Sequence, residues 1–292
     1  MTLTRVLTAA VLIPAVVAVV LWGSTGLVAA ATGLVTVLAL LEFFALAERV
    51  DMHGYRLWTC FCALVLLFHQ WRGSLLESWS IGQGGLVIRN PSGVLAPWFL
   101  GLDAVVLLFV FGTVTLAVTS RRALSEALPS MSVSAAALLF VALPLSFVVR
   151  LHGVRFEGPK LLLFMLVSAW VGDTLAYFVG RTVGRLPMAS EISPKKTWEG
   201  GAANLLGSLL VAVVFRPWLS IEPRHLLIMA VLGNLAGQAG DLFESAYKRS
   251  AGAKDSGTLL PGHGGMLDRI DALILASPAV WYYFDLFISR RG

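Results

Sequence analysis

The stretch HLLIMAVLGNLAGQAGDLFESAYKRSAGAKDSGTLLPGHGGMLDRID, residues 225–271, runs from an apolar segment of helix length into a densely charged loop. Its later part, from Asp241 to Asp271, holds four Asp, one Glu, two Lys, two Arg, one His and five Gly, although only 13% of the whole chain is charged. Acidic residues at both ends, with bases and glycines between them, are typical of a metal–phosphate site. The stretch therefore predicts a membrane helix that leads into a site for phosphoryl or nucleotidyl chemistry.

The apolar character extends over the whole chain. Of its 292 residues, 57% are hydrophobic, and the mean hydropathy is +0.80. Because the apolar runs are continuous rather than alternating, they predict an all-α, polytopic integral membrane protein rather than a closed barrel. About nine transmembrane helices are expected, at residues 5–22, 25–47, 57–70, 94–119, 131–149, 160–180, 200–215, 225–246 and 272–289.

Three of these runs need separate interpretation. The run at 57–70 is short for the ~20 residues that a span needs, and the run at 200–215 is short and rich in glycine. The run at 5–22 resembles a signal peptide. It leads straight into a second apolar run, so we interpret it as a retained helix.

The placement of Lys and Arg predicts the orientation of the chain. With nine spans and the N-terminus inside, 13 of the 22 bases fall in segments on the inner side. This arrangement places both charge-rich loops of the C-terminal half in the cytoplasm, although Arg290 and Arg291 then fall outside. We therefore expect a multi-pass protein of the inner (plasma) membrane whose site faces the cytoplasm.

Polar residues are distributed unevenly along the chain. Residues 1–150 are apolar helices with few polar side chains, whereas nearly all candidate chemistry lies in residues 160–271. We expect one membrane domain, residues 1–292, with an N-terminal scaffold (1–150) and a C-terminal catalytic half (151–292). The net charge of +5 suits anionic lipid headgroups. The lack of a basic soluble domain argues against nucleic acid as a partner.

A polar stripe runs along the apolar helix of the opening stretch. Asn234, Gln238, Asp241, Ser245 and Lys248 follow at spacings of 4, 3, 4 and 3, which places them on one helical face. Lipid would leave these groups unsatisfied, so the stripe faces either a water-filled site or the polar groups of neighbouring helices. In the first case Asp241 is a candidate metal ligand.

The loop at 249–271 is rich in glycine and charge. Glycine turns offer backbone N–H groups that can cradle phosphate oxygens. The basic residues are either phosphate ligands or members of a headgroup-binding loop. Asp268 is either a metal ligand or a helix cap, and His263 is either a base or a backbone anchor. The basic residues are Lys248, Arg249, Lys254 and Arg269, and the turn residues are Gly257, Pro261, Gly262, Gly264 and Gly265.

Two further segments carry candidate residues. Asp173 lies within an apolar run and faces either an interior site or a paired base such as Arg181. Lys195 and Lys196 precede Thr197, a candidate N-cap, and two lysines before a helix N-terminus form either an anion site or an ordinary positive-inside loop. Small residues repeat every four positions beside Asp173 and predict close helix packing. They are Gly172, Ala176, Gly180 and Gly184.

Other catalytic patterns are missing from the sequence. It has no Cys/His cluster for zinc, no G-x-S-x-G element and no Walker A loop. Cys60 and Cys62 lie two residues apart in an apolar run, and we interpret them as core residues. The carboxylates suit Mg²⁺, which prefers oxygen ligands and substrate phosphates.

These residues resemble the signature of the bacterial phosphatidate cytidylyltransferase (CDP-diacylglycerol synthase) family. Its pattern is Ser, two residues, Lys-Arg, four residues, Lys-Asp, a glycine-containing turn, His-Gly-Gly and Asp-Arg-x-Asp. Tyr247 departs from the pattern, because an aliphatic residue or Phe is usual there. The segments around Asp173, at 193–200 and at the opening LTRVLTAAVLIPAV are also similar to the family. The pattern is met by Ser245, Lys248, Arg249, Lys254, Asp255, Gly257, Pro261, His263, Gly264, Gly265, Asp268, Arg269 and Asp271.

The resemblance implies that CTP and phosphatidic acid react to give CDP-diacylglycerol and pyrophosphate. It implies Asp241 and Asp268 as Mg²⁺ ligands, with K⁺ as a second ion, and CTP, phosphatidic acid and membrane lipids as partners. The oligomeric state, with a homodimer as one alternative, stays open. The implied catalytic residues are Asp241, Asp268, Lys248, Arg249 and Lys254, and the implied substrate-binding residues are Lys195, Lys196, Ser245, His263, Gly264, Gly265, Arg269 and Asp173.

Two other functions compete with this reading. A CTP-dependent polyprenol or dolichol-type lipid kinase would transfer the γ-phosphate to an alcohol and would need a base to activate that alcohol. An ion-coupled transporter would use Asp173 and Asp241 as coupling residues, yet the sequence lacks the internal repeat that many transporters have. Product analysis separates the three functions.

Overall fold

The computed structural model describes residues 2–81, 87–91, 101–154, 156–259 and 264–289. Helices dominate it, as the sequence predicts, and two short antiparallel hairpins, β1–β2 and β3–β4, interrupt them. The π-helical turns Leu138–Ala142 and Phe284–Ser289 continue α5 into α6 and extend α10. The elements are α1 (Thr2–Trp22), α2 (Thr25–Glu48), α3 (Arg56–Leu76), β1 (Glu77–Ile81), β2 (Val87–Pro91), α4 (Leu102–Thr119), α5 (Ala127–Ala137), α6 (Leu143–His152), α7 (Gly158–Thr182), β3 (Pro187–Ala189), β4 (Ser193–Thr197), α8 (Trp198–Phe215), α9 (Pro223–Ser250) and α10 (Leu267–Tyr283).

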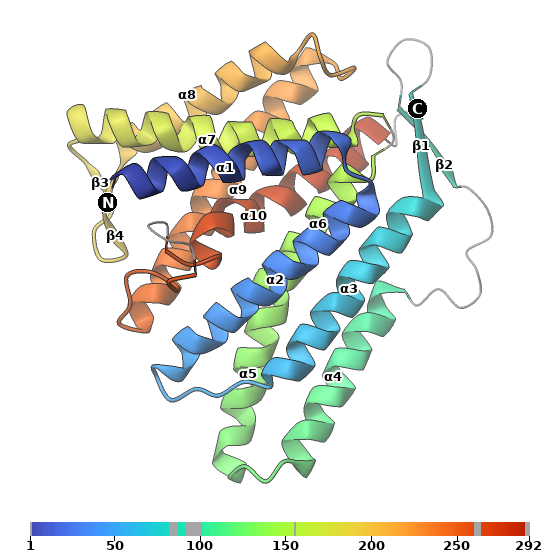
Figure 1. Ribbon diagram of the computed structural model, residues 1–292, viewed down its shortest axis with the longest axis vertical. Coiled ribbons are helices and arrows are strands. Elements are labelled where there is room, and N and C mark those ends of the chain that lie inside the picture. Colours follow the sequence, from blue (N-terminus) through green and yellow to red (C-terminus); the bar gives the residue numbers. More distant parts are fainter. Residues whose placement is uncertain (1, 82–86, 92–100, 155, 260–263, 290–292) are drawn as a thin grey trace.

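The helices form two groups of different inclination (Figure 1). Helices α2, α3, α4 and α5 run steeply, whereas α1 and α7 lie side by side across them. In the C-terminal half each helix packs on the next, in the order α7, α8, α9, α10. Helix α10 in turn packs on α6, which contacts α2 and α3. The C-terminal helices are therefore joined to the N-terminal helices through α10 and α6 and through the contact of α7 with α1.

The core lies where these two groups meet. Phe43 and Phe44 of α2, Phe164 of α7 and Phe284 after α10 are all fully buried. The outward faces are apolar too, and Leu57, Val118 and Val214 are 88%, 79% and 71% exposed. Exposed apolar surface on this scale is unfavourable in water and matches a lipid environment.

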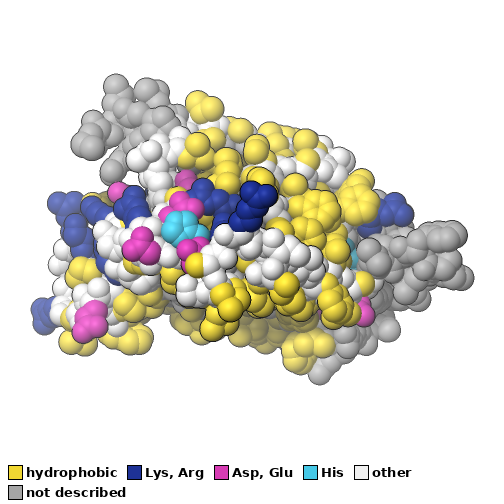
Figure 2. Space-filling view, turned by 90° about the horizontal axis from the view of Figure 1, so that it is seen from below, with side chains coloured by type: hydrophobic (Ala, Val, Ile, Leu, Met, Phe, Trp, Pro, Cys, Tyr) yellow, Lys and Arg dark blue, Asp and Glu magenta, His cyan; other side chains and the backbone are white. Residues whose placement is uncertain are grey.

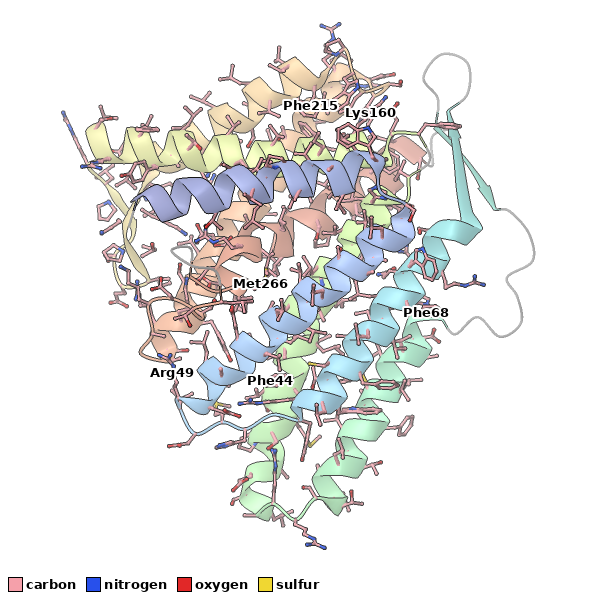
Figure 3. The ribbon with its side chains drawn as sticks, in the orientation of Figure 1. Phe44, Arg49, Phe68, Lys160, Phe215 and Met266 are labelled. Carbon is pink, nitrogen blue, oxygen red and sulfur yellow. The ribbon has the colours of Figure 1, made fainter. Side chains whose placement is uncertain are left out.

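Charged side chains gather at one end of the bundle. Figure 2 views this end from below and shows Lys, Arg, Asp and Glu side chains together beside broad apolar surfaces. The exposed Arg49, Arg121 and Arg122 belong to the connections at this end. Figure 3 shows Lys160 and Phe215 at the opposite end from Arg49. Polar ends and apolar flanks are the surface pattern of a protein that spans a bilayer.

The predicted all-α, polytopic membrane fold is confirmed, but the count of nine spans is not. Seven helices among the described residues are long and apolar enough to cross a membrane: 25–48, 102–119, 124–152, 158–182, 198–215, 223–250 and 267–289. The short predicted run at 200–215 is one of them. The other two predicted runs also form helices. Helix α3 carries polar residues such as His69 and Gln70, and α1 contributes only the shorter apolar segment Ala10–Trp22.

Candidate active site

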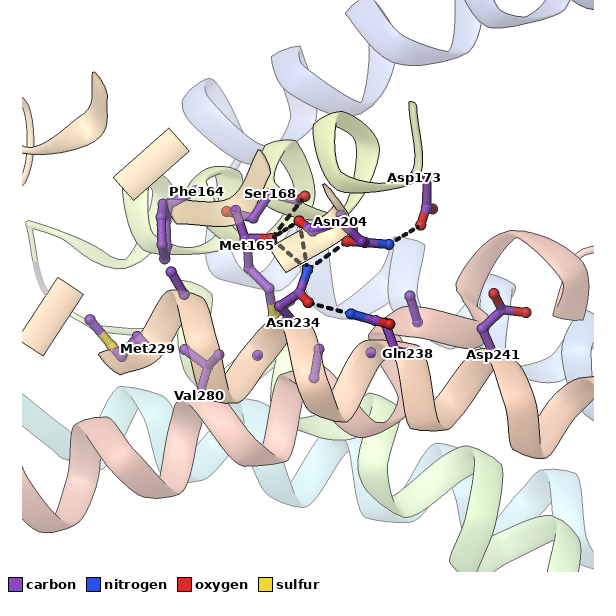
Figure 4. Close-up of a pocket in the computed structure, with 17 residues that line it drawn as sticks. Phe164, Met165, Ser168, Asp173, Asn204, Met229, Asn234, Gln238, Asp241 and Val280 are labelled. Carbon is purple, nitrogen blue, oxygen red and sulfur yellow. Dashed lines mark hydrogen bonds between the residues drawn. The ribbon is translucent and has the colours of Figure 1, made fainter. Parts of the chain in front are cut away.

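A narrow cleft of about 40 Å³ opens between α7, α8, α9 and α10. One end is polar and carries Asp173 and Asp241, whereas the other is apolar and carries Phe164, Met229 and Val280. Figure 4 shows these two groups at opposite sides of the cleft. Asn234, Gln238 and Asp241 of the polar stripe predicted on α9 therefore line a cavity, and an amphipathic ligand matches the lining.

A chain of amide side chains orients the polar wall of the cleft (Figure 4). The Nε2 of Gln238 donates to Oδ1 of Asn234 over 2.6 Å, and the Nδ2 of Asn234 donates to Oδ1 of Asn204 over 2.5 Å. The Nδ2 of Asn204 then donates to Oδ1 of Asp173 over 3.1 Å. Because Asn234 and Asn204 each use both the donor and the acceptor of the amide, the chain holds the Asp173 carboxylate in one orientation. The alternative partner of Asp173, Arg181, instead donates to the Tyr177 hydroxyl.

Close contact between α7 and α8 makes this hydrogen-bond chain possible. A Cβ added at Gly207 would lie 3.1 Å from the Cα of Gly172, and one added at Gly172 would overlap the side chain of Asn204. A Cβ at Gly200 would lie 3.0 Å from the carbonyl oxygen of Ala176. The predicted packing role of the small residues is therefore confirmed.

The β3–β4 hairpin brings a lysine to the polar end of the cleft. Thr197 caps α8, as predicted, because its hydroxyl accepts from the backbone N–H of Gly200 over 3.1 Å. This cap fixes the chain just before α8, where Lys196 forms an ion pair with Asp241, Nζ to Oδ2, over 2.5 Å. Lys195, the next residue out, is exposed.

Three carboxylates from two helices converge beside this ion pair. Asp241 and Glu244 lie one turn apart on α9 and Asp271 on α10, and one oxygen from each lies within 4.8 Å of the others. In an octahedral Mg²⁺ site with bonds of roughly 2.0–2.1 Å, neighbouring ligand oxygens are about 3 Å apart and opposite ones about 4 Å. The cluster is thus a candidate divalent-cation site, because it brings three carboxylate oxygens within 4.8 Å of one another.

Lys248 connects this acidic cluster to Asp268. Its Nζ lies 2.6 Å from Oε2 of Glu244 and 2.6 Å from Oδ1 of Asp268. The Glu244 side chain is only 1% exposed, and that of Asp268 is 7% exposed. Charges buried to this degree persist only when they are paired, so the three groups form one electrostatic unit.

The second oxygen of Asp268 organises the glycine loop. Its Oδ2 accepts from the backbone N–H groups of Gly265 (2.8 Å) and Ser256 (3.0 Å) and from the Ser256 hydroxyl (3.1 Å). Gly264 has a φ of +80°, and a Cβ there would lie 2.7 Å from the same oxygen. Glycine is therefore required at 264 both for the backbone conformation and for space.

The structure brings some predicted residues together and places others at the rim. Asp173, Lys196, Asp241, Lys248 and Asp268 all belong to the polar networks described above. The roles of Asp241 and Asp268 as a pair of metal ligands remain a prediction. The remaining described candidates are Lys195, Arg249, Lys254 and Arg269, which are exposed, Gly264 and Gly265 in the loop, and Ser245, which is buried. His263 lies outside the described residues.

Arg249 has a structural contact at the rim. Its Nε donates to the carbonyl oxygen of Ile192 over 3.2 Å, and its Nη1 donates to that of Ala253 over 3.1 Å. One guanidinium thus ties the β3–β4 hairpin to the start of the glycine loop. These bonds leave part of the charge facing solvent, where a phosphate group could reach it.

Three residues of this site were missed in the sequence. Glu244 follows Asp241 by three residues, and that helical spacing was a usable signal. Asn204 and Glu42 lie on other helices. Glu42 is an acidic residue inside an apolar run, which was a usable signal, although the sequence does not show which groups it contacts. Asp271 belongs to the signature and lies three residues after Asp268, a spacing that predicts that both lie on one face at the start of a helix.

Comparisons with known proteins agree with this geometry. A family model described as the cytidylyltransferase family matches residues 3–287. A phosphatidate cytidylyltransferase of Thermotoga maritima is 34% identical over 209 residues, covering 69% of this chain and 73% of that protein. Proteins of the same name from Bacillus subtilis and Brucella abortus are 35% and 42% identical over 52% and 51% of this chain. The chain spans 57% and 54% of the lengths of these two relatives.

Proposed function

The chain belongs to the cytidylyltransferase family, and we propose on this premise that it transfers CMP from CTP to phosphatidic acid, giving CDP-diacylglycerol and pyrophosphate. One observation carries the proposal. Lys196 and Lys248 alternate with carboxylates around a three-carboxylate cluster at the polar end of an amphipathic cleft. Such an array suits a substrate pair that carries several phosphates and a lipid tail.

The proposed reaction is a displacement at phosphorus. An oxygen of the lipid phosphate attacks the α-phosphorus of CTP, and the bond from that phosphorus to the bridging oxygen of pyrophosphate breaks. The lipid phosphate is already anionic near neutral pH, so the reaction needs no strong general base. The main obstacle is the approach of one anion to another. Fixed cations that face the developing charge lower this barrier.

The acidic residues are proposed to hold the metal. Asp241 and Asp268 are the proposed Mg²⁺ ligands, Glu244 and Asp271 complete the oxygen set around Asp241, and K⁺ is proposed as a second ion. Bound Mg²⁺ would neutralise phosphate charge and stabilise the leaving pyrophosphate. In the substrate-free protein Lys196 and Lys248 orient the carboxylates. When substrate binds, the same two lysines would contact phosphate oxygens.

The surroundings of the site agree with a lipid substrate. In this proposal the start of an acyl chain contacts the apolar end of the cleft, which Phe164 and Val280 line, and the polar end accepts the headgroup. In this proposal residues 151–292 carry the chemistry and residues 1–150 act as the scaffold. The protein lies in the inner membrane with the site facing the cytoplasm, where CTP is present.

The test uses the purified full chain in lipid with phosphatidic acid, Mg²⁺ and CTP labelled in the α-phosphate. We expect label in the lipid and free pyrophosphate, and at least 100-fold less of both with Asp268→Asn, because the amide cannot satisfy Lys248 and the loop donors together. Glu222→Gln, which removes an exposed ion pair with Arg224, is the matched control. Label that stays in soluble nucleotide would reject the transferase, and transfer from γ-labelled CTP to a lipid alcohol would identify a kinase.

A further inference from the structure

A carboxylate of the N-terminal scaffold reaches into the glycine loop of the site. Glu42 lies in α2, more than 200 residues from the loop in sequence. Its Oε1 accepts from the backbone N–H of Met266 over 2.8 Å. Its Oε2 accepts from the N–H of Leu267 over 2.9 Å and from the Ser256 hydroxyl over 2.8 Å. Figure 3 shows Met266 beside α2, where the two halves of the molecule meet.

Glu42 supplies a cap that α10 lacks in its own sequence. The first N–H groups of a helix have no partner within the helix, and they favour a negative charge. Met266 at the N-cap position of α10 provides no side-chain acceptor. The carboxylate of Glu42 fills this position from another helix. An acidic residue within a membrane span is costly unless such specific partners exist.

The contacts of Glu42 continue directly to the predicted metal ligand Asp268. The Ser256 hydroxyl lies 2.8 Å from Glu42 Oε2 and 3.1 Å from Asp268 Oδ2, so it sits between the two carboxylates. Asp268 is in the first turn of the helix that Glu42 caps. On its other oxygen Asp268 holds Lys248. A displacement of Glu42 would therefore move both the loop and the first turn of α10.

Two glycines of the signature loop are shaped around this carboxylate. A Cβ added at Gly257 would lie 2.6 Å from Glu42 Oε1, and all of its nearest neighbours are atoms of Glu42. A Cβ at Gly265 would overlap both Glu42 Oε2 and the Ser256 hydroxyl. The carboxylate thus accounts for the absence of side chains at positions 257 and 265.

The next residue of α2 provides a second anchor. The Phe43 ring stacks on the Tyr247 ring of α9, with centroids 4.1 Å apart and planes 5° from parallel. The Tyr247 hydroxyl donates to the Phe43 carbonyl oxygen over 3.1 Å. Consecutive residues of α2 therefore hold α9, which carries Asp241 and Lys248, and the loop that leads to α10, which carries Asp268. Tyr247, which departs from the family pattern, therefore packs against Phe43 in this chain.

We propose that Glu42 is a positioning residue of the active site. It fixes the glycine loop at residues 256–257 and 265, together with the first turn of α10, so that Asp268 and Lys248 are aligned with the acidic cluster. This role rests on the proposed transferase function. Glu42 is assigned no contact with substrate or metal. The scaffold helix α2 is, in this view, a part of the catalytic apparatus.

The first test compares Glu42→Ala and Glu42→Gln with Glu48→Gln in the full chain. Glu48 lies on the same helix and pairs with Arg56, away from the loop. We expect Glu42→Ala to lower kcat/KM about 100-fold, as for misplaced catalytic groups, and to raise the half-saturating Mg²⁺ concentration about 10-fold. Glu42→Gln keeps the shape of the side chain and one acceptor oxygen, so its kcat/KM and its half-saturating Mg²⁺ concentration should lie between those of Glu42→Ala and the wild type. Glu48→Gln should match the wild type in both.

The second test is a double-mutant cycle with Gly257. In the wild type, Gly257→Ala forces its Cβ against Glu42, and we expect a loss of roughly 10-fold in kcat/KM. In the Glu42→Ala background the space is vacant, so the same glycine substitution should cost nothing further. Additive losses in the cycle would contradict a direct contact between the two positions.

Amide hydrogen exchange provides a readout that does not depend on activity. The N–H groups of Met266 and Leu267 should lose protection in Glu42→Ala, while α7 and α8 keep theirs. Unchanged exchange at Met266 and Leu267 would overturn the proposal. The proposal would also fail if kcat fell only in proportion to the fraction of folded protein while the Mg²⁺ dependence stayed the same. If the wild type makes no CDP-lipid, the proposed function fails, whereas the exchange result still tests the contact of Glu42.

Discussion

At the scale of single residues, the site is an alternation of positive and negative groups. Lys196 pairs with Asp241 from the hairpin side, and Lys248 lies between Glu244 and Asp268. Each lysine is held by carboxylates, so its position is set before any substrate arrives. Fixed charges that do not need to reorganise are the most effective kind for stabilising a transition state.

Lys196→Met removes the cation at the mouth of the cleft while keeping the apolar stem. We expect kcat/KM for CTP to fall about 100-fold, because a fixed positive charge next to the phosphates is lost. Lys196→Arg should retain a larger share of the activity. The measurement is the initial rate over a range of CTP concentrations. Arg216→Met, which removes an exposed cation after α8, is the control. An unchanged kcat/KM in Lys196→Met would exclude a role in phosphate binding.

Glu244→Gln tests the acidic cluster without a change of size. If Glu244 completes the oxygen set, the half-saturating Mg²⁺ concentration should rise about 10- to 100-fold, because a charged oxygen ligand or its close neighbour is replaced by a neutral group. Titration of the activity with Mg²⁺ at saturating CTP measures the shift. Glu222→Gln serves again as the control. The same Mg²⁺ dependence in both variants would remove Glu244 from the proposed site.

At the scale of elements, the contact of α7 with α8 determines the geometry of the polar wall. Glycines at 172, 200 and 207 bring the two backbones together, and Asn204 then bridges from α8 to Asp173 on α7 and Asn234 on α9. A longer distance between the helices would break this chain of amides. Small residues therefore matter here for the position of polar groups as well as for packing.

Gly207→Val places a branched side chain against the backbone of Gly172. Because that backbone cannot yield, we expect a loss of about 1–3 kcal/mol in stability, seen as a lower thermal midpoint in detergent. Gly33→Ala is the control, since its Cβ would meet only Leu64 and Leu67 side-chain atoms at 3.4 and 3.9 Å. Equal midpoints for the two variants would show that α7 and α8 are not in tight contact.

At the scale of the whole molecule, the two halves are connected through several helix contacts and through specific side-chain contacts near the site. Helix α10 packs on α6, and Glu42 and Phe43 of α2 hold the glycine loop and α9. The expected division into a scaffold and a catalytic half stays a prediction. The contacts of Glu42 and Phe43 connect the N-terminal residues to the C-terminal residues at the candidate active site.

The orientation in the membrane is testable with single cysteines in a chain whose Cys60 and Cys62 are replaced by Ala. Thr258 in the glycine loop and Arg216 after α8 are both exposed. If the site faces the cytoplasm, a membrane-impermeant maleimide should label Thr258→Cys in inside-out vesicles and Arg216→Cys in right-side-out vesicles. The reverse pattern would mean that the positive-inside bias of 13 to 9 bases misassigns the chain.

The sequence alone determined the fold class and the positions of the helices, because both depend on local chemistry. In lipid each backbone polar group must be satisfied within its own segment, so apolar runs of sufficient length become helices. The same reasoning predicted the Thr197 cap, the glycine packing stripe and the polar face that carries Asn234 and Gln238. Each of these is a relation between residues a few positions apart.

Only the tertiary structure decided which side chains meet. The carboxylates of Asp241 and Asp271 come from different helices, and Glu42 lies 214 to 225 residues from the groups that it binds. Helical periodicity shows the face on which a residue lies but not the helix that this face will contact. Those pairings follow from the packing of all the helices together, where burying a charge is tolerated only beside its partner.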